Sequence, residues 1–176
     1  DAVAAMGIVQ KINQVPMQIA MGLSQGIMPL ISYNYSSKNY KRMRKTLTFT
    51  AKISQGFLCT VAVAYFVFAG NLVAMFMNNE VIIGYGTQFL RGFCISMPFL
   101  CMDFLAVGVF QAVGLGRYAL VFAIMRKVVL EIPALYILNA LFPLYGLAYA
   151  QLTAEVVLAA AAVIVLIRLF GKLDRE

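Results

Sequence analysis

The chain has 176 residues, of which 62% are apolar and only 12% are charged, with a formal net charge of +7. Ordinary soluble domains contain roughly 45–50% apolar and about 25% charged residues, and a soluble chain of this length could not bury so much hydrocarbon. The composition therefore excludes an ordinary soluble domain and indicates an all-α integral membrane protein. The cations flank apolar stretches and form no patch with stacking aromatics, so we expect no nucleic-acid partner.

Apolar stretches that could cross a bilayer, which takes about 20 residues as a helix, recur along the chain. In the third of them Pro98 and Asp103 interrupt the apolar run, and the fourth contains Arg126 and Lys127. We expect the first part of the fourth stretch to be a cytoplasmic helical extension, with the span itself starting near Val128. The whole chain, residues 1–176, is predicted as one membrane domain, a polytopic bundle of about five transmembrane helices at residues 2–32, 47–70, 89–110, 118–142 and 147–170.

The predicted helix at residues 2–32 is the least apolar of these and carries one narrow polar stripe. At 100° per residue, an arc of about 80° contains five of its positions, namely Lys11, Gln14, Gln18, Gly22 and Gln25. Polar side chains in a span face protein or water. The stripe therefore either hydrogen-bonds to neighbouring helices or lines an aqueous cavity, and in both cases the helix belongs in a bundle.

Lysines and arginines gather in alternate connections between the predicted spans. They occur in the loop at residues 38–45, around the start of the fourth span, and in the tail from Arg168 onwards, whereas residues 71–88 and 140–145 contain none. Membrane proteins keep such residues on the cytoplasmic side. This pattern predicts an N-terminus outside, a C-terminus in the cytoplasm, and membrane lipid as the surrounding partner.

The sequence contains no pattern typical of a metal site or of an enzyme. Cys59, Cys94 and Cys101 lie in apolar runs without C-x-x-C spacing, and the chain has no histidine, so we expect buried free thiols. A phosphate loop and a nucleophile beside a base are also missing from the sequence, which argues against an enzyme.

Asp1 opens the chain without a basic leader or an initiator methionine, so we expect a piece of a longer protein.

Three carboxylates, on Asp103, Glu131 and Glu155, lie inside the apolar spans. An acidic residue at the centre of a span costs up to about 2.5–3.5 kcal/mol, so each must face the bundle, pair or be protonated, and a buried protonatable carboxyl suits proton exchange. Glu131 follows Lys127 by four residues and could be half of a structural ion pair. Glu155 shares its face with small residues, so close packing explains it as well as transport does. Lys11 could neutralise one of the three.

Asp103 is the strongest functional candidate among these carboxylates. No basic residue lies one turn away from it on its own helix, and Ser96 and Phe110 share its face. An unpaired carboxylate on a proline-containing span suits cation binding better than architecture.

The run from Gly22 to Arg42, GLSQGIMPLISYNYSSKNYKR, resembles the signature of the multidrug and toxin extrusion family, in which a helix carrying Q-G-x-x-P ends in Y-N-Y-G-A-x-N and a basic residue. Two further runs, FQAVGLGRYALVFAIMRKVVLEIPALYIL at 110–138 and YGLAYAQLTAE at 145–155, resemble later parts of the same family. The motif residues matched in the first run include Gln25, Pro29, Tyr33, Asn34, Asn39 and Arg42.

The resemblance implies helices eight to twelve of a twelve-helix, two-lobe transporter of the bacterial cytoplasmic (inner) membrane, with the N-terminal lobe of the same protein as the missing partner. It implies a secondary active antiporter that couples Na⁺ or H⁺ entry to the export of small organic cations and drugs, with no other cofactor. The ion or substrate pathway would include Asp103, Glu131, Glu155, Lys11, Gln14, Gln18 and Gln25.

Two alternatives remain open. A lipid-linked saccharide flippase of the same fold group would need cations for a pyrophosphate, for which only Lys11 and Arg91 are candidates. A truncated membrane subunit that does not transport is the other alternative.

Overall fold

A computed structural model describes residues 1–175, and this part of the chain is built from helices without a strand. The all-α membrane fold predicted from composition is therefore confirmed. A π-helical segment, η1, interrupts the fourth pass of the chain. The elements are α1 (Ala2–Ser36), α2 (Tyr40–Val67), α3 (Ala69–Ala74), α4 (Glu80–Ala112), α5 (Gly116–Ile124), η1 (Met125–Glu131), α6 (Ile132–Leu141) and α7 (Gly146–Leu173).

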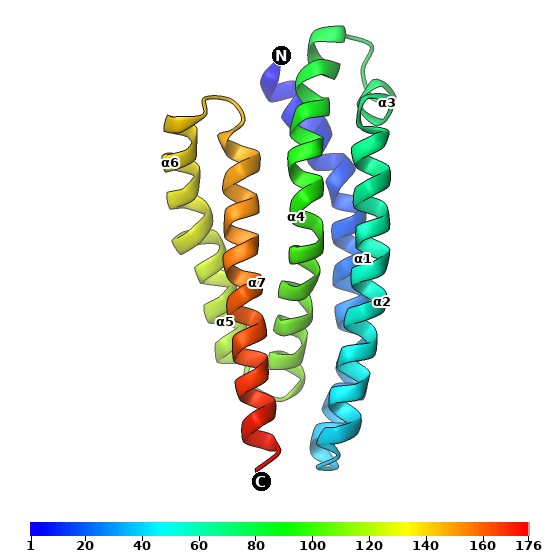
Figure 1. Ribbon diagram of the computed structural model, residues 1–176, viewed down its shortest axis with the longest axis vertical. Helices are drawn as coiled ribbons and strands as arrows, with labels where there is room; N and C mark the ends of the chain where they lie inside the picture. The colour runs from blue at the N-terminus through cyan, green and yellow to red at the C-terminus, as the bar shows by residue number, and fades with distance from the viewer. Residues whose placement is uncertain (176) are drawn as a thin grey trace.

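Helix α4 is the centre of the bundle. It contacts α1, α2, α3, α5 and α7, and Figure 1 shows α1 and α2 on one side of it and α5, α6 and α7 on the other. Successive passes run in opposite directions, so that the two chain ends lie at opposite ends of the bundle (Figure 1). This central place explains why α4, among the most apolar segments of the sequence, buries residues along its whole length.

Three helices, α2, α4 and α7, are long and apolar enough to cross a membrane. The polar stripe lowers the hydropathy of α1, and the fourth pass is divided among α5, η1 and α6, each of them short. Five spans at the boundaries given above therefore stay a prediction, although the fourth pass runs alongside α7 (Figure 1). The helices of the bundle extend beyond several of these boundaries, because helix ends continue into the flanking polar residues.

The family motif at the end of α1 builds the turn into α2. The backbone N–H of Asn39 donates to the carbonyl of Asn34 at 2.8 Å, and the Asn39 side chain accepts from the N–H of Arg42 at 3.2 Å, which caps α2. Lys38 takes the left-handed conformation, with φ of 55°. Asn34 is buried and donates to the carbonyl of Leu30 at 2.8 Å. The turn therefore forms through asparagine hydrogen bonds, while Pro29, Tyr33 and the side chain of Arg42 remain exposed.

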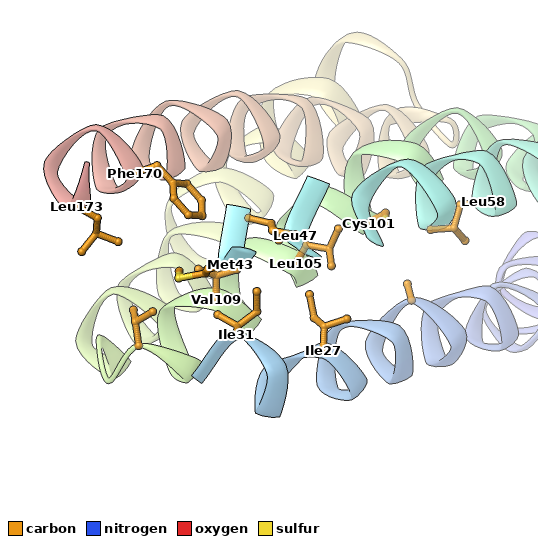
Figure 2. Close-up of a cluster of buried hydrophobic side chains, with 12 residues drawn as sticks. Ile27, Ile31, Met43, Leu47, Leu58, Cys101, Leu105, Val109, Phe170 and Leu173 are labelled. Atoms are coloured by element: carbon orange, nitrogen blue, oxygen red, sulfur yellow. The ribbon is translucent and has the colours of Figure 1, made fainter. Parts of the chain in front are cut away.

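Three clusters of apolar side chains hold the helices together. One joins α1, α2, α4 and α7 through residues such as Ile31, Met43 and Val109 (Figure 2), a second joins α1, α3 and α4, and a third joins α4, α5 and α7. Cys94 and Cys101 are buried free thiols, as predicted, but Cys59 is exposed. The prediction of burial was wrong for Cys59 because an apolar run in a membrane protein does not say which of its faces meets other helices.

The close approach of α1 to α4 depends on a glycine. Ser24 on α1 donates its hydroxyl to the carbonyl of Phe104 at 2.6 Å. A Cβ atom at Gly108 would collide with the Ser24 hydroxyl oxygen. The absence of a side chain at Gly108 thus lets Ser24 reach the α4 backbone just beyond Asp103.

Candidate functional site

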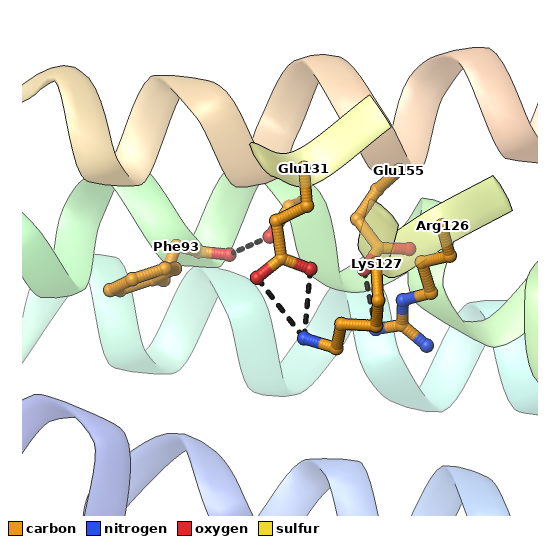
Figure 3. Close-up of polar contacts among 6 residues, drawn as sticks. Phe93, Arg126, Lys127, Glu131 and Glu155 are labelled. Atoms are coloured by element: carbon orange, nitrogen blue, oxygen red, sulfur yellow. Dashed lines mark hydrogen bonds and ion pairs between the residues drawn. The ribbon is translucent and has the colours of Figure 1, made fainter. Parts of the chain in front are cut away.

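A buried ion pair links the fourth pass to α7. Arg126 in η1 donates from Nη2 to Oε1 of Glu155 at 2.6 Å. The Glu155 side chain is 1% exposed and that of Arg126 16%. The guanidinium also lies 5.5 Å from the centre of the Phe104 ring on α4. Contact between opposite charges lowers the cost of burying them, and Figure 3 shows the two side chains meeting between their helices. Nε of Arg126 and Oε2 of Glu155 have no hydrogen-bond partner within residues 1–175.

Asp103 lies beside this pair and has no partner of its own. Its side chain is 3% exposed, and neither carboxylate oxygen accepts a hydrogen bond within residues 1–175. It lines a cavity of about 230 Å³ together with Phe104, Arg126 and Lys127.

The charges of this cluster do not balance. Asp103 and Glu155 supply two carboxylates, whereas Arg126 supplies one guanidinium. When both carboxylates are ionised the cluster carries one more negative than positive charge, and a buried net charge is costly inside a membrane. One bound monovalent cation, such as a proton or Na⁺, would neutralise the cluster.

The π-helical turn places Arg126 in this cluster. Residue 133 is proline, which has no N–H and whose ring clashes with the carbonyl of Val129 one turn earlier. The chain widens into η1 directly before this proline, and such widened turns are frequent at functional sites.

Lys127 and Glu131 form the second ion pair of this region. Lys127 Nζ donates to both carboxylate oxygens of Glu131, at 3.0 and 2.8 Å. This confirms the predicted pair, which Figure 3 shows beside the Arg126 pair. Both residues, with Gln10 and Gln151, line a further cavity of about 250 Å³. Because Lys127 lines both cavities, polar groups continue from Asp103 to Glu131.

The polar stripe of α1 lies apart from this cluster. Its side chains at Lys11, Gln14, Gln18 and Gln25 are exposed and make no hydrogen bond or ion pair within the described residues. Neither cavity at Asp103 and Glu131 is lined by them. Lys11 makes no ion pair within the described residues, so the hypothesis that it neutralises Glu131 or Glu155 was wrong, because Lys127 and Arg126 pair with these carboxylates. The stripe makes no hydrogen bond to the other helices within residues 1–175, so hydrogen bonding to a neighbouring helix and lining of an aqueous cavity both stay predictions.

Arg126 is a residue of this charged cluster that the sequence interpretation did not include among the site residues. It was assigned to a cytoplasmic extension because a cation ordinarily marks the edge of a span. The available signal was the presence of carboxylates inside apolar spans, each of which requires a partner. Sequence spacing could connect Lys127 to Glu131 on one helix, but it could not connect Arg126 to a residue on another helix.

The comparisons with known proteins agree with the fold and the motifs. The MatE family model matches residues 1–137, so the chain belongs to this family, as the motifs predicted. It is 34% identical over 172 residues to the "Multidrug export protein MepA" of Staphylococcus saprophyticus and 36% identical over 173 residues to that of a bovine strain of Staphylococcus aureus. In each case the alignment covers 98% of this chain and 38% of the relative, so the chain spans well under half the length of these proteins.

Solved transporter structures have the same fold. A MATE family transporter in an outward-facing conformation matches with a TM-score of 0.93 and 18% identity, over 99% of this chain and 40% of that one. An inward-facing conformation matches with a TM-score of 0.92 and 18% identity, over 99% and 41%. The chain thus has the fold of one part of such a transporter.

Proposed function

We propose that this chain supplies the C-terminal lobe of a cation-coupled multidrug exporter, in which Asp103 takes up the coupling cation. The observation that carries the proposal is the buried Asp103 carboxylate, which faces a cavity but accepts no hydrogen bond within the described residues. The only guanidinium of that cavity already bonds to Glu155. This arrangement supports a monovalent coupling cation, H⁺ or Na⁺, as the ligand of Asp103.

The transported substrates in this proposal are small organic cations and drugs. The MepA relatives are named as multidrug export proteins, which supports this substrate class. The outward-facing polar stripe of α1 supports a second lobe as partner, because exposed glutamines and a lysine need protein or water beside them in a membrane. The likeness to both outward-facing and inward-facing structures supports a lobe that moves as one body. We place the protein in the bacterial cytoplasmic membrane with the C-terminus of this chain inside.

A lipid-linked saccharide flippase is less well supported. Such a function requires cations that are available to a pyrophosphate. The two cations that line the cavities at Asp103 and Glu131 are Arg126 and Lys127, and they are already paired with Glu155 and Glu131.

The test is Asp103→Asn in the full-length transporter, reconstituted in liposomes with an imposed proton or sodium gradient. We expect gradient-driven drug efflux to be lost, while binding of a fluorescent drug in detergent is kept. Glu80→Gln is the matched control, because Glu80 is an exposed carboxylate at the start of the same helix, and it should transport normally. Full gradient-driven efflux by Asp103→Asn would refute the proposal.

A further inference from the structure

A groove on the outside of the bundle lies between α2, α4 and α7. It has a volume of about 280 Å³ and shares no lining residue with the cavity at Asp103. Leu47 of α2, Leu105 of α4 and Phe170 of α7 belong to its wall, and Figure 2 shows these three side chains in one apolar cluster. All of its lining side chains are apolar except Arg44 and Thr48. The groove is therefore an apolar trough with one polar end.

A basic hollow continues from this polar end along α2. It contains Lys41, Arg44, Lys45 and Lys52 and shares Arg44 and Thr48 with the groove. At 100° per residue these four positions fall within an arc of about 100°, so one face of the helix carries all of them. The hollow lies at the end of the bundle where the positive-inside pattern places the cytoplasm.

Arg44 is fixed at the junction of the groove and the hollow. Its guanidinium lies 5.8 Å from the centre of the Phe170 ring, and Nη1 donates to Oδ2 of Asp174 at 3.3 Å. The side chain is nevertheless 57% exposed, so donors remain for a further anion. Asp174 offsets only part of the positive charge, because Lys41 and Lys45 stand one turn or less away on the same helix.

We propose that the groove and the hollow together bind one anionic phospholipid, with its phosphate at Arg44 and Lys45 and an acyl chain along the accessible lining side chains Met102, Val163 and Ile167. A phosphate diester needs charged donors, and an acyl chain needs an apolar surface that continues from those donors. Basic pockets between transmembrane helices on the cytoplasmic side suit lipid headgroups. A partner helix fits less well, because a helix with its side chains is about 10 Å wide. A helix of this width would rest over the groove without entering it.

The test measures lipid binding to the full-length transporter, purified and delipidated in detergent. Phosphatidylglycerol and phosphatidylcholine with identical acyl chains are added, and retained lipid is counted by native mass spectrometry beside the melting temperature. We expect phosphatidylglycerol to be retained and to raise the melting temperature more than phosphatidylcholine does. Arg44→Gln with Lys45→Gln should lower the apparent affinity for phosphatidylglycerol by about tenfold or more.

Two further variants separate a defined site from general surface charge. Lys38→Asn with Arg117→Gln removes the same charge from exposed positions outside the groove and hollow and should leave affinity unchanged. Ala51→Leu narrows the groove without changing charge and should weaken binding of the whole lipid. If the double variant of Arg44 and Lys45 does not fold, Ala51→Leu and Lys45→Gln alone carry the same test.

Four results would overturn the proposal. Equal binding of phosphatidylcholine would mean that no headgroup is recognised. An equal loss in the Lys38 and Arg117 variant would mean that only diffuse charge acts. Equal stabilisation by soluble glycerol phosphate would mean a phosphate site without an acyl groove. Undiminished lipid binding in both Ala51→Leu and the Arg44 and Lys45 variant would place the lipid elsewhere.

Discussion

Arg126 and Glu155 stand 29 residues apart in the sequence and meet at 2.6 Å inside the bundle. Asp103, from a third helix, lines a cavity with the same guanidinium. The three side chains therefore form one electrostatic unit in which two carboxylates share one cation. Arg126 pairs with Glu155 and lines the same cavity as Asp103, so we expect substitutions at the three positions to have unequal effects.

Arg126→Gln should destabilise the protein more than Glu155→Gln does. Loss of Arg126 leaves two buried carboxylates without a cation, which costs about 3–5 kcal/mol. Loss of the Glu155 charge leaves Arg126 beside Asp103, so the cost should stay near that of one weakened hydrogen bond, about 1–3 kcal/mol. Thermal and denaturant unfolding of the purified variants measures the difference. Equal losses, or a larger loss for Glu155→Gln, would contradict the shared-cation arrangement.

Asp103→Asn should leave the melting temperature level or raise it. The substitution removes the excess negative charge from a buried cluster and breaks no hydrogen bond, since Asp103 accepts none within residues 1–175. Removal of a desolvated charge is neutral or stabilising when the remaining pair is intact. A loss of several degrees, with efflux retained, would instead assign Asp103 to the architecture of the bundle.

Gly108→Ala should lower stability by about 1–3 kcal/mol, because its new methyl group meets the Ser24 hydroxyl. Ser24→Ala in the same protein should restore part of the loss, and a double-mutant cycle measures this coupling. Gly84→Ala is the matched control on α4, since nothing lies within 4 Å of its Cβ position, and it should be neutral or stabilising. Additive effects of the Gly108 and Ser24 changes would show that the two helices are not in contact there.

Gln18→Leu in the full-length transporter should alter drug selectivity or lower efflux while expression holds. Gln18 is exposed on α1 and belongs to the stripe that would face the transport pathway. Leu30→Met, at an exposed apolar position of the same helix, should have no effect. Efflux measured against several drugs gives the comparison, and identical profiles for both variants would reduce the stripe to packing against the second lobe.

Single cysteines at positions 41 and 78 should differ in labelling by an impermeant maleimide in intact cells. Position 78 should react and position 41 should not, because the basic loop is predicted to be cytoplasmic. Asn78 is preferred to Asn79, whose side chain caps α4. Cys59 is exposed and must be replaced first. The opposite labelling pattern would invert the topology.

The sequence by itself determined the membrane setting, the family and the ion pair between Lys127 and Glu131. Composition was sufficient to exclude a soluble domain, and the motif ending at Arg42 was sufficient to predict the family. The Lys127–Glu131 pair was predictable because residues four apart lie on one face of any helix. These features depend on helical periodicity and amino-acid composition, and both can be read from short stretches of the sequence.

Only the tertiary structure decided which groups share the interior. Hydropathy placed Arg126 at the edge of a span, yet a π-helical turn and the packing of α7 bring it to Glu155. The tertiary structure also leaves Lys11 without an ion pair within residues 1–175 and leaves Cys59 exposed. The reason is physical, since a buried charge selects its partner by distance in three dimensions, and the relative rotation and depth of packed helices is fixed by contacts such as Ser24 against Gly108.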